Sequence, residues 1–186
     1  MTRKSIRHVL LLRGVNVGGH RKLAMASLRD GLTNAGCSHV VTYIQSGNIV
    51  LTPPRLGPVD VASWAGRVVS DIAGFEVNVV VRTAAELTDT VHASPYPDAD
   101  PTTLHVVFFD RAPDQLRALD PARFGPERFA LVGRDLYLQL PNGLGRAALP
   151  AAMDALVRKL DPPVVITVRN WRTIGKLIEL ARSPPS

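Results

Sequence analysis

Seven cations stand in four short segments that are rich in glycine and asparagine and contain no aspartate or glutamate. The segments are residues 13–22 (RGVNVGGHRK), 45–48 (QSGN), 141–148 (PNGLGRAA) and 169–176 (RNWRTIGK). Their cations are Arg13, Arg21, Lys22, Arg146, Arg169, Arg172 and Lys176. The chain has 22 Lys+Arg against 16 Asp+Glu, so these segments hold its entire formal excess of +6. Such clustering favours a small anionic ligand over a uniformly basic surface.

The first segment nearly matches the phosphate-binding loop G-x-x-x-x-G-K-[ST]. Gly14 and Gly19 have the required spacing. However, His20 replaces the lysine that reaches the terminal phosphates, and Arg21 replaces the hydroxyl that binds magnesium. The chain is therefore not a nucleoside triphosphatase of that class. Two interpretations remain: the glycines form an anion-binding nest of backbone N–H groups, or they serve a tight strand–helix connection that needs positive φ.

Residues 143–148 (GLGRAA) match the dinucleotide-binding pattern G-x-G-x-x-G/A. The preceding strand lies in a predicted hairpin, though, and the following strand ends in Arg169, where an acid should bind the ribose. We interpret this motif as a glycine turn, and no cofactor is expected.

Arg169, Asn170 and Trp171 stand where the last predicted strand passes into the last helix. Asn170 is of a type that caps helix N-termini, and Arg169 beside such a terminus suits an anion. Trp171 belongs to the apolar stripe of the helix, which favours a core position over a ligand platform; the stripe also contains Ile174, Leu177, Ile178 and Ala181.

No pattern typical of a metal site or a nucleophile is present. The five histidines have no metal-ligand spacing, and Cys37 is the only thiol. Ser46 lacks the context of a nucleophile elbow. The sequence leaves open whether the protein is an enzyme, and any catalysis would rest on electrostatic stabilisation by the loop groups.

Composition points to a globular cytoplasmic protein. Hydrophobic residues make up 46% and charged residues 20%, close to globular averages. The apolar run after the basic start is cut by Arg13, which makes it too short for a signal peptide. A single cysteine fits a reducing compartment. We expect no membrane partner, and the sequence does not indicate an oligomeric state.

Both halves show the same order of predicted elements, β-α-β-β-α-β. In the first half these are residues 6–12, 25–35, 39–44, 49–51, 59–73 and 77–82, followed by a helix over 84–93. In the second half they are residues 103–109, 113–119, 127–132, 136–140, 149–160 and 164–168, followed by a helix over 170–182. No residue-level repeat of fixed period accompanies this order.

This order predicts an α+β fold of two tandem ferredoxin-like βαββαβ units with a C-terminal helix. Each unit should hold a four-stranded antiparallel sheet. The predicted domains are residues 1–83, a helix and proline-rich connection over 84–101, and residues 102–186. The alternative is one mixed sheet shared by both halves.

Three segments together resemble a known family: LLRGVNVGGHRKLAMASLR, TYIQSGNIVL and TVRNWRTIGKLIEL. They are similar, in this order from about Arg7 to Leu180, to the domain of unknown function 1697 (DUF1697) family of bacterial proteins. The resemblance implies an α+β fold of ferredoxin-like units and no activity, because the family is uncharacterised. The family motifs fall on Arg13, Gly14, Asn16, Gly18, Gly19, Gln45, Ser46, Gly47, Asn48, Arg169, Asn170, Trp171 and Lys176.

Two departures from the family pattern bear on function. After Arg146 the family usually has Ser-Lys, whereas this chain has Ala147 and Ala148. After Trp171 the family usually has Asn, whereas this chain has Arg172. A ligand contact or catalytic role at those positions would be altered in this chain.

We expect the motif residues, together with Lys22, to bind a small anionic, phosphate-bearing ligand. On this hypothesis residues 14–22, 45–48 and 169–176 lie in one patch. A second hypothesis is binding of RNA or single-stranded nucleic acid, but only 5% of residues are aromatic. The strand candidates for base stacking are Tyr43, Phe108, Phe109 and Tyr137. A third is a structural or partner-binding module without a ligand.

Overall fold

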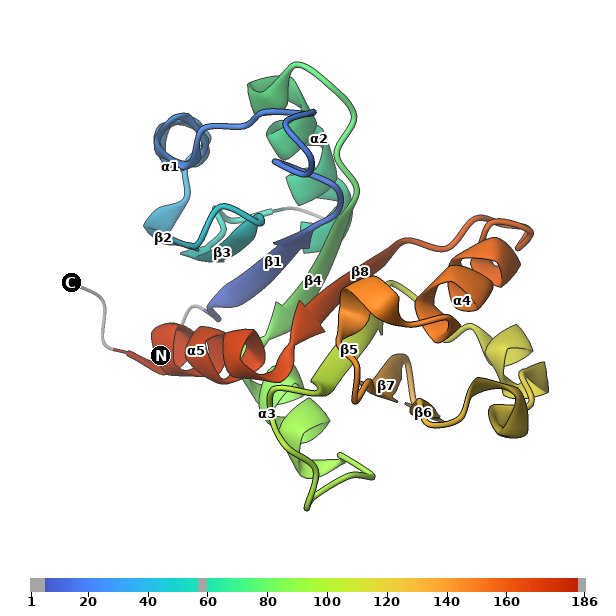
Figure 1. Cartoon of the computed structure of the whole chain (residues 1–186). Helices are drawn as coiled ribbons and strands as arrows, with labels where there is room; N and C mark the ends of the chain where they lie inside the picture. The colour runs from blue at the N-terminus through green and yellow to red at the C-terminus, as the bar shows by residue number, and fades with distance from the viewer. Residues whose placement is uncertain (1–5, 57–59, 184–186) are drawn as a thin grey trace. The chain divides into compact units, whose positions relative to one another are not determined.

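The computed structural model describes residues 6–56 and 60–183 (Figure 1). Over these residues the chain forms two four-stranded antiparallel sheets, five α-helices and three short 3₁₀ helices. The fold is therefore α+β, and the alternative of one mixed sheet is wrong.

The first sheet comes from the first half of the chain and has the strand order β2-β3-β1-β4. Its elements are β1 (His8–Leu12), α1 (Met25–Asn34), β2 (Ser38–Tyr43), β3 (Asn48–Thr52), α2 (Val61–Ala73) and β4 (Val79–Thr83). Asp60 caps the N-terminus of helix α2, because its carboxylate accepts from the Ser63 N–H at 2.9 Å. Gly74 caps the C-terminus and has the left-handed φ of 74° that is typical of a glycine at this position. The predicted start of this helix at residue 59 lies outside the described residues.

The second sheet has the matching order β6-β7-β5-β8. Its elements are β5 (Leu104–Phe109), η1 (Asp114–Ala118), η2 (Pro121–Phe124), β6 (Arg128–Val132), β7 (Asp135–Gln139), η3 (Leu144–Arg146), α4 (Leu149–Val157) and β8 (Ile166–Asn170). The helix predicted over 113–119 is a 3₁₀ turn followed by a second one that starts with Pro121. Helical segments this short commonly adopt the tighter 3₁₀ form.

One further helix follows the last strand of each sheet: α3 (Ala84–His92) after β4 and α5 (Trp171–Arg182) after β8. The contacts between residues divide the chain into two compact units, and the boundaries fall inside these two helices. Unit 1 consists of residues up to Thr88 and those from Lys176 onward, and unit 2 consists of Asp89–Gly175. Much of the terminal helix, which the sequence places with the second half, is thus grouped with the first sheet. The domain boundaries predicted at residues 83 and 101 stay predictions.

Hydrogen bonds attach the C-terminal end of α5 to unit 1 and the C-terminal part of α3 to unit 2. In unit 1, the Arg7 guanidinium donates to the carbonyls of Leu180 (3.0 Å) and Ser183 (2.7 Å). In unit 2, the Thr90 hydroxyl donates to the Asp135 carboxylate at 2.7 Å, and the Tyr137 hydroxyl donates to the Thr90 carbonyl at 2.7 Å. Burial raises the pKa of Tyr137, and the negative charge of Asp135 raises it further. The phenol therefore stays a proton donor.

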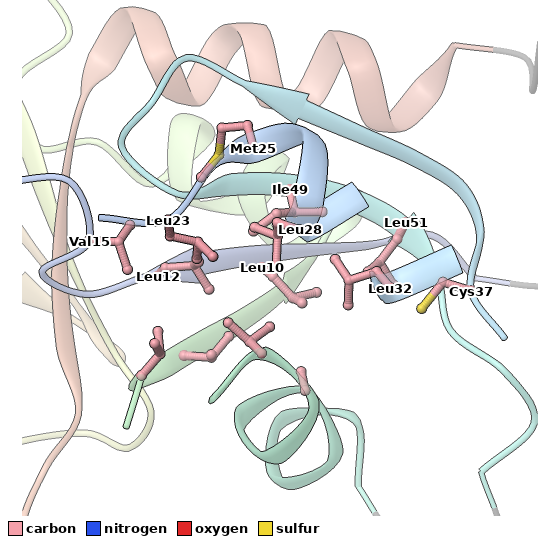
Figure 2. Close-up of a cluster of buried hydrophobic side chains, with 14 residues drawn as sticks. Leu10, Leu12, Val15, Leu23, Met25, Leu28, Leu32, Cys37, Ile49 and Leu51 are labelled. Carbon is pink, nitrogen blue, oxygen red and sulfur yellow. The ribbon is translucent and has the colours of Figure 1, made fainter. Parts of the chain in front are cut away.

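The core of unit 1 lies between one face of the first sheet and helices α1 and α2 (Figure 2). Alternate residues of the strands face this core, as the two-residue period of a strand requires. They meet the apolar stripe of α1, whose period brings three side chains to one side. The cluster includes Leu10, Leu12, Ile49 and Leu51 from the strands and Met25, Leu28 and Leu32 from α1.

The opposite face of each sheet is buried as well. Val9 and Leu11 on β1 are both 0% exposed, and so are Val106 and Phe108 on β5. Continuous apolar strands of this kind are typical of sheets covered on both faces. The central strand of each sheet therefore tolerates polar atoms only where they are hydrogen-bonded.

The two sheets carry the same residue types at matching positions. His8 on β1 pairs with Thr83, and His105 on β5 pairs with Asn170. Thr83 and Asn170 each cap the helix that follows. The Thr83 hydroxyl accepts from the Glu86 N–H at 3.2 Å, and the Asn170 amide oxygen accepts from the Thr173 N–H at 2.8 Å. Burial lowers the pKa of both His8 and His105.

Beside each histidine lies a buried arginine. Val9 pairs with Arg82, and Val106 pairs with Arg169. The arginines are 1% and 8% exposed. Each donates from Nη1 to the carbonyl of the residue before it, at 3.0 Å for Arg82 and 2.7 Å for Arg169. The two units therefore share a residue-level repeat that the sequence alone does not reveal.

We predict opposite effects for two glycine-to-alanine changes in helices. A Cβ on Gly31 in α1 would lie 2.7 Å from Cγ1 and Cδ1 of Ile72, so Gly31→Ala should destabilise the chain by about 1–3 kcal/mol through overpacking. A Cβ on Gly66 in α2 meets nothing within 4 Å, so Gly66→Ala should stabilise it by about 0.5–1 kcal/mol. Urea unfolding measures both. Equal stabilisation by the two changes would contradict this packing.

Stability should fall as the pH drops below about 6.5 because of His8 and His105. In the folded chain the pKa values of both histidines lie below the ordinary 6.5. As the pH falls, these histidines therefore take up protons in the unfolded chain before they do so in the folded chain. Their contribution is present above about pH 6.5 and is lost as the pH falls through the folded pKa values. Unfolding free energies at several pH values should show a shallower slope in the His8→Gln/His105→Gln variant. Replacing the exposed His92 is the control, and an unchanged slope in the double variant would refute the assignment.

Candidate functional site

The loop that follows β1, residues 13–22, is called here the glycine loop. Two apolar side chains anchor it to the core of unit 1. Val15 is 2% exposed and Leu23, just after the loop, is 5% exposed. Figure 2 shows both beside Leu12 at one end of the cluster. The glycine loop therefore stands on a rigid base, although most of its residues are exposed.

A single asparagine closes the glycine loop. The Asn16 side-chain oxygen accepts from the Leu23 N–H at 2.8 Å. Its amide nitrogen donates to the carbonyls of Leu23 and Gln45, both at 2.9 Å. The Asn16 backbone N–H donates to the Arg21 carbonyl at 3.1 Å. Asn16, which was predicted as a ligand contact, thus joins the two ends of the loop and links them to residue 45.

The turn over residues 45–48 lies against the same base. The Asn48 amide donates to the Tyr43 carbonyl at 3.2 Å and to the Ser46 hydroxyl at 3.0 Å. The Gly47 carbonyl accepts from the Leu12 N–H at 2.8 Å. A Cβ on Gly47 would lie 2.6 Å from the Leu12 Cβ, so this turn requires glycine for its close approach as well as for its φ of 75°. The structure therefore brings together two of the predicted motif segments.

Left-handed backbone is frequent in the glycine loop. There φ is positive at Gly14 (66°), Asn16 (55°), Gly18 (57°), Gly19 (78°) and Arg21 (50°). Between these residues Val15 and Val17 keep the usual negative φ, so the sign alternates from residue 14 to residue 18. Val17 and His20 form an antiparallel bridge, in which the His20 N–H donates to the Val17 carbonyl at 3.0 Å. Positive φ at both residues between them, Gly18 and Gly19, is the pattern of a type I′ turn.

Several donors of the glycine loop are unoccupied. Among the residues described, the backbone N–H groups of Gly14, Gly18 and Gly19 donate to no acceptor within the chain. A Cβ built on any of these glycines would meet nothing within 4 Å. Their backbone is therefore open to a molecule from outside.

The cations of the glycine loop have different surroundings. Arg21 is held within unit 1, since its guanidinium donates to the Glu76 carbonyl and lies 4.9 Å from the centroid of the Phe75 ring. Lys22 is exposed, and Arg13 is half-buried at the end of β1. The Arg13 N–H donates to the Asn78 carbonyl at 2.9 Å. Among the cations of this loop, Lys22 is thus the exposed one, and Arg13 lies beside the open backbone at Gly14.

The residues predicted at the start of the last helix are engaged in structural contacts. Burial lowers the pKa of Arg169 to about 10. The Arg169 guanidinium donates to the Thr167 hydroxyl at 2.7 Å. The cap predicted for Asn170 is confirmed by its bond to Thr173. Trp171 is half-buried, and Lys176 pairs with Glu179 at 2.7 Å.

These residues and the glycine loop fall in different units, except for Lys176. Residues 14–22 and 45–48 come together in unit 1, whereas Arg169, Asn170 and Trp171 belong to unit 2. The single patch expected from the sequence stays a prediction.

The N-terminus of α4, which follows the GLGRAA motif, is already bound by an acid of the same chain. Glu127 accepts from the Ala148 N–H through one carboxylate oxygen and from the Leu149 N–H through the other, both at 2.8 Å. A dinucleotide pyrophosphate would need such N–H groups. The motif therefore works as a turn capped by Glu127. No local sequence pattern marks this pairing, because Glu127 lies far from α4 along the chain.

Other candidate chemistries find little support. Cys37 is 5% exposed, and burial raises the pKa of its thiol to about 11, which keeps it protonated and unreactive at neutral pH. Among the described residues, no group of three or more His, Cys, Asp and Glu side chains is placed to hold a metal ion. No helix in the described ranges is long and apolar enough to span a bilayer.

The fold and the glycine loop define an α+β protein with two four-stranded antiparallel sheets and a motif-rich loop at the end of its first strand. The family model described as "Protein of unknown function (DUF1697)" matches residues 6–137. The chain therefore belongs to the DUF1697 family.

A solved structure supports the same fold. The conserved bacterial protein SP0830 from Streptococcus pneumoniae aligns with a TM-score of 0.70 at 24% sequence identity. The alignment covers 95% of this chain and 99% of that one. No curated protein matches the chain.

We predict that loss of the Asn16 amide loosens the glycine loop. Asn16→Ala removes three side-chain hydrogen bonds and places alanine at a φ of 55°, so it should destabilise the chain by about 2–4 kcal/mol. Asn16→Gly removes the same bonds without the backbone strain and should cost about 1 kcal/mol less. Hydrogen exchange of the Leu23 amide should accelerate in both variants. Unchanged exchange at Leu23 would show that Asn16 does not hold the loop.

Proposed function

We propose that this protein binds a small anionic, phosphate-bearing ligand at the glycine loop, and that it does so in the cytoplasm. The observation that carries the proposal is the group of unoccupied, exposed backbone N–H groups at Gly14, Gly18 and Gly19. Arg13 and Lys22 add positive charge, and no acid lies between residues 13 and 22.

Phosphate suits such a loop for a simple reason. Its oxygens accept several hydrogen bonds at once, and exposed backbone N–H groups donate to them without the entropy cost of ordering long side chains. Because Val15, Leu23 and Asn16 fix the base of the loop, the donors are largely held in place before the ligand arrives. Preorganised donors of this kind also stabilise charge that develops during a reaction. Any catalysis here would work in that way.

We also propose that each unit is a variant of the ferredoxin-like split βαβ arrangement. The matching strand orders and the order β-α-β-β-α-β in unit 1 support this. Unit 2 departs from it where η1 and η2 replace a helix after β5. The glycine loop then has no counterpart of equal length in unit 2.

The aromatic residues weigh against nucleic-acid binding. Phe108 and Phe109 are 0% exposed and Tyr137 is 2% exposed. Readers of single-stranded RNA stack bases on exposed aromatic side chains of a sheet. These three rings cannot serve that purpose.

The experiment that tests the proposal is a melting scan with inorganic phosphate and with simple phosphate monoesters. A ligand at 100 times its Kd should stabilise the folded chain by about 2.7 kcal/mol. Arg13→Ala should abolish this stabilisation, and Lys22→Ala should weaken it. Arg55→Ala removes an exposed cation elsewhere in unit 1 and is the matched control.

A salt titration with single-stranded RNA completes the test. The nucleic-acid alternative requires tight binding with a log–log salt slope of about −0.7 per phosphate contacted. Steep, sub-micromolar RNA binding without any phosphate-induced stabilisation would replace our proposal. Absence of both responses would favour a module without a ligand.

A further inference from the structure

The first strand of each sheet ends in the same way, and this allows the two ends to be compared. The last pair of the β1–β4 ladder is Leu12 with Val79, and the last pair of the β5–β8 ladder is Phe109 with Ile166. One residue further on, Arg13 and Asp110 occupy equivalent positions.

The backbone contacts at these positions match. The Arg13 N–H donates to the Asn78 carbonyl at 2.9 Å, and the Asp110 N–H donates to the Val165 carbonyl at 3.1 Å. In a regular antiparallel pair the opposite residue would donate back. This return bond is missing in both units: the N–H groups of Asn78 and Val165 donate to no backbone carbonyl across the ladder. Each unit therefore leaves an N–H without a backbone acceptor at the same point.

Unit 2 shows what occupies that point. One oxygen of the Asp110 carboxylate, Oδ1, accepts from the Val165 N–H at 3.1 Å and from the Arg111 N–H at 2.9 Å. Two backbone donors from different segments thus converge on one anionic oxygen. The chain itself demonstrates that this strand end accommodates a carboxylate.

Unit 1 has the donors without the carboxylate. The equivalents of Val165 and Arg111 are Asn78 and Gly14, and within the described part of the chain neither N–H has an acceptor. Both residues are exposed. The residue in the place of Asp110 is Arg13, which reverses the charge from acid to cation. A cation cannot accept from these donors, but it attracts an anion toward them.

We infer that in unit 1 an oxygen of the anionic ligand takes the place that the Asp110 carboxylate oxygen holds in unit 2. It accepts from the N–H groups of Gly14 and Asn78 beside Arg13. The inference rests on the proposed function and adds to it a second segment, the residues before β4, which no sequence motif marked. It also identifies the ligand group as a carboxylate-like or phosphate oxygen that accepts two hydrogen bonds at the end of β1.

The direct test follows backbone amide resonances of the full chain in a titration with inorganic phosphate, with chloride at equal ionic strength as the control. The amide protons of Gly14 and Asn78 should move downfield together and saturate at the same phosphate concentration. If phosphate raises the melting temperature but the shifts fall on Gly18 and Gly19 alone, the proposed function stands and this inference is wrong. If phosphate changes neither the spectrum nor the melting temperature, both are wrong.

A second test uses unit 2 and does not depend on Arg13. Asp110→Ala empties the place of the carboxylate and should lower the melting temperature, and phosphate or formate should restore part of the loss. The Arg111 and Val165 amides should then respond to the added anion. Asp110→Asn keeps an oxygen acceptor and should lose less stability and show a smaller anion response. An Asp110→Ala variant whose Arg111 and Val165 amides ignore both anions would overturn the comparison on which the inference rests.

Discussion

The central strand of each sheet is buried on both faces, and the rest of the structure depends on this constraint. Val9, Leu10 and Leu11 on β1 are all 0% exposed, as are Val106 and Phe108 on β5. Because water cannot reach these strands, their backbone groups need partners within the sheet, and each strand pairs with a neighbour on both sides. Close packing on both faces makes these strands rigid. Only at their ends does the chain regain access to solvent. The glycine loop begins at such an end, where rigid support and exposed donors meet.

The same constraint explains why the two units resemble each other in residue type. A polar side chain on a doubly covered sheet must find partners within the fold, and few arrangements supply them. The buried arginines Arg82 and Arg169 use the same carbonyl of the preceding residue, and Asn48 and Asp135 begin equivalent strands. The sequence conceals this repeat because the segment between the first and third strands is longer in unit 1. There it contains α1 and the glycine loop, so no fixed period connects the halves.

Local patterns were enough to predict most elements of the fold. The predicted ends of most strands and helices lie within two residues of those observed, since apolar alternation and capping residues act over short distances. Asn170 as a cap followed from the same local logic. The 3₁₀ turns after β5 and the early end of α4 at Val157 were not predicted, because they depend on how much apolar surface each segment buries. Long-range pairing was also out of reach: neither Glu127 at the α4 terminus nor Arg21 at the Glu76 carbonyl has a local signal.

The comparison of Arg13 with Asp110 connects stability to recognition. In unit 2, a strand end that leaves two backbone donors exposed is satisfied by an acid in the chain, and the bond is always available because its partner is covalently attached. In unit 1, the acid is replaced by a cation, and the donors face solvent. An anion that replaces water at these donors forms charge-assisted hydrogen bonds, which are stronger than neutral ones. Because only the folded chain brings the two donors together, such binding stabilises the folded state. On our proposal, an oxygen of the ligand at the start of the glycine loop therefore takes the part that the Asp110 carboxylate plays in unit 2.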